Sequence, residues 1–174
     1  MGTTNRSFWK LLPLLGLFFC FSGCKYYSFT GADIDYSQTK TFQVNNFVNN
    51  APLVEPRVAR DFTLALQDLL LNQTSLELVN TNGNLLYEGE IVQYYVSPIT
   101  ATSQSTAAQN RLTIAVNVRF FNSNDPEKDF EQRFSFYYDY SGSAQLVGSQ
   151  LETALEIIFE RLTQDIFNKS LANW

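Results

Sequence analysis

Histidine is absent from this chain of 174 residues, and cysteine occurs only twice. Histidine is the usual general base near neutral pH and the commonest zinc ligand, so its absence removes both roles. The sequence also has no dinucleotide-binding glycine pattern, P-loop, HExxH, GxSxG or EF-hand pattern. We therefore predict that the chain is not an enzyme, with no catalytic residues, no metal site and no cofactor.

Positive charge is also scarce, with 12 Lys and Arg against 17 Asp and Glu. Binding to a phosphate backbone needs a concentrated basic face, and no basic cluster is present, so nucleic acid is excluded as a partner. Two carboxylate pairs, Glu88/Glu90 and Asp129/Glu131, each share one side of a strand-like run. Such a pair could serve a glycosidase, but a solvated strand face explains both pairs more simply.

The N-terminus has the parts of a secretory signal. Arg6 and Lys10 precede an apolar run from residue 11 to 21, which is too short to span a bilayer. Small Ser22 and Gly23 then precede Cys24, as in the lipidation site of a bacterial lipoprotein. An ordinary secretory signal is the alternative. Cys20 is a poorer lipidation site, because bulky Phe19 before it would obstruct cleavage.

Cleavage before Cys24 would remove residues 1–23 as a signal peptide and leave 151 residues, a typical length for one domain. The removed segment carries two of the 12 basic residues and none of the 17 acidic ones, so the mature net charge is −7. Acylation of Cys24 leaves no thiol pair for a disulfide. We expect a lipidated tether over 24–39 and a single domain over 40–174.

Hydrophobic periodicity divides the rest of the chain into helices and strands. Residues 80–84 contain Asn-Gly and predict a hairpin-type reversal, and 100–109 form a polar loop. The strand at 85–99 is ambiguous, because it has apolar residues on both faces and could be bent. The expected elements are strands at 41–48, 76–78, 85–99, 111–121 and 130–140, and helices at 55–73 and from 148 or 149 to about 168.

The order is strand, helix, three or four strands, and helix. Two amphipathic helices each need an apolar surface, and the strands with one apolar face provide it. We therefore predict an α+β two-layer sandwich, with both helices packed on one face of a four-stranded, mostly antiparallel sheet.

Several runs resemble the LptE family of LPS-assembly lipoproteins, in its more divergent branch. The resemblance covers the whole mature chain and depends on the order and spacing of these runs: KTFQV (40–44), NAPLV (50–54), YEGEI (87–91), NRLTI (110–114), DPEKDFE (125–131) and DIFNKSLANW (165–174). The fold predicted above is also the one that this family implies.

The resemblance implies an outer-membrane lipoprotein that plugs and helps assemble the LptD β-barrel and assists LPS insertion into the outer leaflet. Lys25 follows Cys24, with no acidic residue of the kind used for inner-membrane retention or surface export. We therefore expect anchoring on the periplasmic side of the outer membrane. The alternative is a stand-alone periplasmic lipoprotein that binds small amphiphiles.

Binding of an anionic glycolipid would need basic side chains at one end of the sheet. The candidates on or between the last two strands are Arg111, Arg119, Lys128 and Arg133. The alternative is that they are solvated charges, paired across the hairpin with Glu131 and Asp129. Because the mature chain is acidic, the resemblance implies barrel plugging more strongly than LPS binding.

Overall fold

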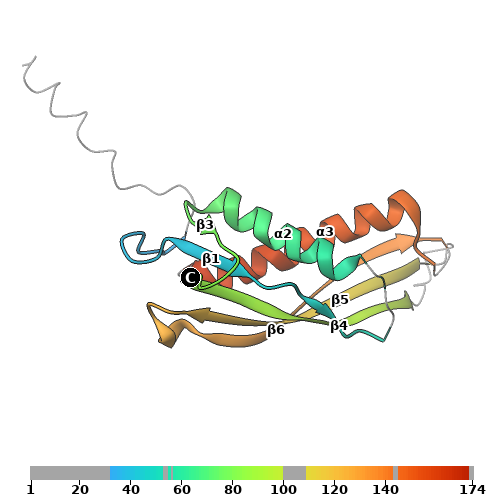
Figure 1. The fold of residues 1–174 in the computed structure, drawn as a ribbon. Coiled ribbons are helices and arrows are strands. Elements are labelled where there is room, and N and C mark those ends of the chain that lie inside the picture. The colour runs from blue at the N-terminus through green and yellow to red at the C-terminus, as the bar shows by residue number, and fades with distance from the viewer. Residues whose placement is uncertain (1–31, 53–54, 56, 100–108, 143–144, 173–174) are drawn as a thin grey trace, which may run out of the picture. The chain divides into compact units, whose positions relative to one another are not determined.

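The computed structural model describes residues 32–52, 55, 57–99, 109–142 and 145–172 (Figure 1). The two helices of the described segments lie on one face of the sheet, as predicted (Figure 1). The elements in chain order are β1 (Thr41–Val44), β2 (Val48–Asn49), α2 (Val58–Gln73), β3 (Glu77–Leu78), β4 (Leu85–Ile99), β5 (Gln109–Asn122), the 3₁₀ turn η1 (Pro126–Lys128), β6 (Phe130–Ser141) and α3 (Gly148–Leu171).

The sheet is mixed and has more strands than predicted. Its order is β3-β1-β4-β5-β6, and β2 also pairs with β4. Strands β4, β5 and β6 form an antiparallel meander, whereas β1 lies parallel to both β3 and β4. The prediction of four mostly antiparallel strands was therefore wrong. The cause is the crossover through α2, which returns the chain to the same end of the sheet and makes the next strands parallel to β1.

The reversal at residues 80–84 is not a hairpin, because β3 and β4 lie on opposite sides of β1. The segment crosses β1 at Phe42 and Gln43, and Asn82 takes a positive φ of 56° in it. A Cβ on Gly83 would lie 2.7 Å from the backbone nitrogen of Gln43. The turn residues were recognised correctly from the sequence, but they serve a crossing of β1.

A β-bulge explains the two-sided apolar pattern of β4. The register against β5 shifts between Ile91 and Gln93, so Val92 is the extra residue. Tyr87 and Ile91 are buried on the helix side before the bulge, and Tyr94 is buried after it. One extra residue moves the apolar positions from odd to even numbers without turning the strand over.

The core lies between the sheet and the helices, and aromatic rings connect its layers. Phe62 of α2 contacts Phe47 and Phe159 edge-on, at centroid distances of 4.9 and 5.5 Å. Phe62 is fully buried, and the other two rings are almost so. Edge-to-face aromatic pairs add to the stabilisation from burial. The triad therefore links the β1–β2 segment to both helices.

The compact unit begins at Ala32, within the segment expected to be a tether. Ala32 forms an antiparallel bridge with Ala172, and the backbone nitrogen of Asp33 donates to the carbonyl of Leu171. Asp35 accepts hydrogen bonds from the backbone and hydroxyl of Ser37. Residues 32–39 are thus packed on the fold, and 24–31 lie outside the described residues. No helix of the described segments is long and apolar enough to cross a membrane.

Tyr87 provides a test of the core that depends on pH. Its hydroxyl lies 2.9 Å from the Ser170 hydroxyl, which itself donates to the carbonyl of Ile166. Burial raises the pKa of Tyr87 above its ordinary value. The folded state thus favours the neutral hydroxyl of Tyr87. The stability that this neutral side chain gives the fold is complete below about pH 10 and is lost as pH rises further.

We expect Tyr87→Phe to lower the free energy of unfolding by about 1 kcal/mol at pH 7, since one hydrogen bond is lost. We also expect the variant to lose less stability than wild type above pH 10. Urea denaturation at pH 7 and pH 10.5 measures both effects. Tyr95→Phe, at an exposed position, serves as the control. Equal alkaline losses in wild type and Tyr87→Phe would contradict the assignment.

Candidate functional site

The sheet has an open face on the side away from both described helices (Figure 1). Strands β4, β5 and β6 place alternate side chains there in rows that follow the strand register. Most of these side chains are polar or charged. The open face has one apolar pair at its end, Leu86 and Phe121, of which Phe121 is 39% exposed. The rest of the open face consists of Glu88, Glu90, Gln93, Tyr95, Ser97, Arg111, Thr113, Ala115, Asn117, Arg119, Glu131, Arg133, Ser135, Tyr137 and Asp139.

Arg119 lies at the centre of a carboxylate-rich row. Its Nε lies 2.9 Å from Glu88 Oε1 on β4, and Glu131 is its register partner on β6. The hydrogen bond to Glu88 raises the pKa of Arg119 further above its already high value. The Asn45 amide also donates to Glu88, at 3.1 Å. An incoming anion would meet the Glu88 carboxylate beside this guanidinium.

Arg133 on β6 has a neutral partner instead. Its guanidinium donates to Gln93 Oε1 at 2.6 Å, across the small residue Ala115 on β5. Within the described part of the chain, no carboxylate lies within 4.0 Å of Arg133. Of the three arginines on the open face, Arg133 is therefore the one without a carboxylate partner.

Arg111 lies near the other end of the open face. It donates to both oxygens of Asp139, at 2.7 and 2.8 Å, and stacks 3.7 Å from the centroid of the Tyr137 ring. The hydrogen bonds from Arg111 hold the pKa of Asp139 below its ordinary value. Tyr137 and Tyr95 flank Thr113 and are about half exposed, at 46% and 54%.

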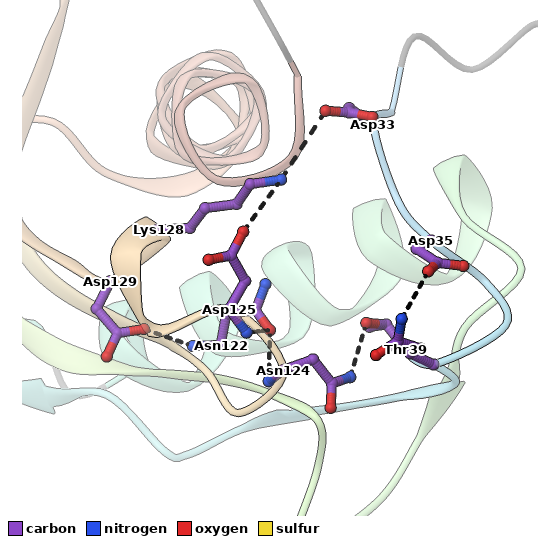
Figure 2. Close-up of polar contacts among 9 residues, drawn as sticks. Asp33, Asp35, Thr39, Asn122, Asn124, Asp125, Lys128 and Asp129 are labelled. Atoms are coloured by element: carbon purple, nitrogen blue, oxygen red, sulfur yellow. Dashed lines mark hydrogen bonds and ion pairs between the residues drawn. The ribbon is translucent and has the colours of Figure 1, made fainter.

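Lys128 is not on the open face. It lies in η1, between β5 and β6, and its ammonium is 3.8 Å from both Asp33 and Asp125 (Figure 2). Nearby, the Asn124 amide donates to the hydroxyl of Thr39 (Figure 2). Lys128 thus joins the N-terminal segment to the β5–β6 turn.

The structure therefore brings together only two of the four basic residues predicted to contact LPS. Arg119 and Arg133 are diagonal neighbours across β5 and β6. Arg111 lies eight residues from Arg119 on the same strand, about 26 Å away. The predicted alternative, pairing with Glu131 and Asp129, also differs in detail, because the ion-pair partners are Glu88, Asp139, Asp33 and Asp125.

Two cavities flank Lys128, with volumes of about 220 and 250 Å³. Both are lined by Asp33, Lys128, Ser170 and Leu171, at the C-terminal end of α3. Pockets for drug-sized ligands usually measure about 300–1,000 Å³ and are mainly apolar. Neither cavity is large enough for a multi-chain lipid. Cys24, the predicted lipidation site, lies outside the described residues.

Comparisons with solved structures give distant likenesses. A hypothetical protein, CT253 from Chlamydia trachomatis, is similar with a TM-score of 0.50 and 10% identity, over 75% of this chain and 95% of that one. A minor lipoprotein from Acinetobacter baumannii has a TM-score of 0.44 and 15% identity, over 76% and 94% of the two chains. At such identities the likeness concerns the fold alone, and no curated protein matches this chain.

A comparison of the sequence with family models identifies the family. A family model described as LptE: Lipopolysaccharide-assembly matches residues 39–170, well over half of the chain. The match includes α2, the complete sheet and nearly all of α3. It confirms the resemblance seen in the sequence runs. The chain therefore belongs to the LptE family of lipopolysaccharide-assembly proteins.

Proposed function

We propose that this chain is a lipid-anchored subunit of the LPS translocon that plugs an LptD β-barrel and helps it assemble. In this role the chain binds the barrel and supports its assembly, and it carries out no reaction. The observation that carries the proposal is the open face of the sheet, which is polar and internally hydrogen-bonded. Family membership gives the general role in LPS assembly, and the open face supplies the physical reason for a barrel partner.

A barrel lumen is polar, and a plug must match it without leaving charges unpaired. On the open face, Arg119 and Arg111 already have carboxylate partners, and Arg133 has Gln93. No buried side-chain polar atom in the described part of the chain lacks a hydrogen-bond partner. Such a face can contact lumen side chains and water at little desolvation cost. Tyr95 and Tyr137 add two amphipathic contact points on it.

The anchor in this proposal is an acylated Cys24 in the periplasmic leaflet of the outer membrane. Stable anchoring takes more than one acyl chain, which a bacterial lipoprotein carries. Lys25 favours the outer membrane over retention at the inner one. The compact unit begins at Ala32, so seven residues separate the proposed anchor from the fold.

Detergent extraction and affinity capture test the barrel partner. We expect a tagged chain, expressed at its native level, to co-purify with a barrel protein of LptD size in near-equal amount. The control is an unrelated outer-membrane lipoprotein with the same tag, which should not capture the barrel. Recovery of the chain without any barrel protein would contradict the proposal and favour the alternative, a stand-alone binder of amphiphiles.

For LPS contact we propose Arg133 as the principal residue among the predicted four. We expect Arg133→Gln to reduce photo-crosslinking of the chain to LPS by at least about threefold, since one charge-assisted phosphate contact is lost. The matched control is Arg60→Gln on exposed α2, which should crosslink like wild type. Unchanged crosslinking in Arg133→Gln, with the barrel still co-purifying, would place LPS contact elsewhere.

A further inference from the structure

Two neighbouring rows in the middle of the open face carry no charge. Each row crosses β4, β5 and β6, and we call the two together the uncharged rows. Their members are Gln93, Ala115 and Ser135 in one row, and Tyr95, Thr113 and Tyr137 in the other. The row on either side contains one arginine and one carboxylate, which are Arg133 with Glu90 and Arg111 with Asp139. A ligand on the uncharged rows therefore meets hydrogen-bonding groups and aromatic rings and lies between balanced charges.

The β-bulge at Val92 gives β4 its part of the uncharged rows. Before the bulge, even-numbered residues such as Glu90 lie on the open face, and after it odd-numbered residues do, beginning with Gln93. Without the extra residue, Val92 and Tyr94 would lie there instead. Bulges are frequent beside binding sites, where they re-aim side chains. The bulge at Val92 thus supplies an amide and an exposed phenol to the middle of the open face.

The two tyrosines of the uncharged rows form an aromatic platform. Both are about half exposed, and they lie two strand spacings apart, about 10 Å between Cα atoms. Tyr137 is held in place, because Arg111 stacks on its ring and is itself fixed by both oxygens of Asp139. A sugar ring has a face of C–H groups and a rim of hydroxyls, and a tyrosine matches both with its ring and its phenol. The spacing of the platform suits two consecutive sugar rings.

The remaining side chains of the uncharged rows can bond to sugar hydroxyls. The carbonyl oxygen of Gln93 accepts from Arg133 at 2.6 Å, so the NH₂ group of Gln93 points away from this arginine and is able to donate. Within the described segments, the hydroxyls of Thr113 and Ser135 have no hydrogen-bond partner in the protein. Each can donate and accept, as a sugar hydroxyl also does.

We propose that the uncharged rows bind a saccharide, namely the sugars of LPS that adjoin its phosphate groups. This inference rests on the proposed function, in which Arg133 contacts an LPS phosphate. Tyr137 lies four residues from Arg133 on β6, about 13 Å along the strand, so one LPS molecule reaches both. The family of this chain acts in LPS assembly, and LPS carries a phosphate and a saccharide on one molecule.

A comparison of two ligands, LPS and lipid A, tests the saccharide site on the full-length, detergent-solubilised chain. Lipid A keeps the phosphates and acyl chains but lacks the sugars beyond its own disaccharide. We expect wild type to bind LPS about fivefold more tightly than lipid A, from the aromatic contacts. Tyr95→Ala should lose this preference by a loss of LPS affinity alone, and Tyr95→Trp should keep it. Both affinities are measured by competition against a photo-crosslinkable LPS probe.

Arg133→Gln separates this inference from the proposed function. It should weaken both ligands and keep the preference for LPS, because both ligands carry the phosphate. The matched control for Tyr95→Ala is Phe121→Ala, which removes an exposed ring of the same face outside the uncharged rows and should keep the preference. Urea denaturation checks that each variant is folded.

Equal affinity of wild type for LPS and lipid A would overturn the saccharide site and leave phosphate contact at Arg133 in place. Equal losses for the two ligands in Tyr95→Ala would also overturn it. If Tyr95→Ala keeps the preference but no longer captures the barrel protein, the tyrosines contact the barrel wall, and the saccharide site is again overturned. Failure of both ligands to compete would contradict the LPS contact of the proposed function, and the saccharide site with it.

Discussion

Gly89→Ala is expected to destabilise the fold by more than about 3 kcal/mol, a large part of the stability of a domain of this size. A Cβ at residue 89 would lie 2.0 Å from the backbone oxygen of Asn117 on β5 and 2.9 Å from Cε1 of Phe47. The nearer of these atoms is backbone in the middle of the antiparallel ladder. Relief of the overlap would require separation of the two longest strands, so we expect little relaxation.

Urea denaturation of wild type and Gly89→Ala measures this loss. Gly142→Ala is the matched control, because its φ is +113° and no atom lies within 4 Å of the added Cβ. There only backbone strain acts, and we expect a loss of about 1–2 kcal/mol. A second substitution, Phe47→Leu, should not rescue Gly89→Ala, because the backbone overlap remains. A loss in Gly89→Ala no larger than that of the control would show that β4 and β5 can separate locally.

Cys24→Ser is expected to abolish lipid anchoring. The substitution removes the thiol that carries the first lipid, and each buried CH₂ of a lipid chain contributes about 0.8 kcal/mol to membrane affinity. We expect the chain to move from the membrane pellet to the soluble periplasmic fraction or to keep its signal peptide. Incorporation of labelled palmitate should fall to background.

Cys20→Ser provides the matched control, because it changes the other cysteine of the same segment. We expect this variant to keep both the palmitate label and the membrane association of wild type. Labelling that survives Cys24→Ser but not Cys20→Ser would reverse the assignment of the two cysteines. If both variants keep the palmitate label, that result would contradict lipidation at this segment.

The strands that depend on local pattern were predicted well from the sequence. In β5 the alternation of Leu112, Ile114 and Val116 predicted a strand with one buried face. The side chains of all three residues are fully buried. The pattern of β4 was ambiguous, because one inserted residue, Val92, interrupts the period of two. A bulge cannot be separated from a two-sided strand until the partner strand fixes the register.

The order and direction of the strands were harder to predict. The short β3 pairs with β1 and not with β4, so pairing depends on contacts between residues about 35 positions apart. The basic residues predicted to contact LPS show the same limit, because their partners are also distant in sequence. Their types suggested anion contact, but their neighbours come from other strands, as with Gln93 for Arg133 and Glu88 for Arg119. Side-chain partners across a sheet follow from register, which one strand's sequence does not specify.

The attachment of the N-terminal segment sets how mechanical load enters this domain. A pull on the chain before Ala32 acts first on its bridge to Ala172 and on the hydrogen bond from Asp33 to Leu171. It reaches β1 only after these contacts and the ion pair with Lys128 have broken. The end of α3 and the β5–β6 turn therefore shield the parallel strands from tension, and the sheet is not peeled from its first strand.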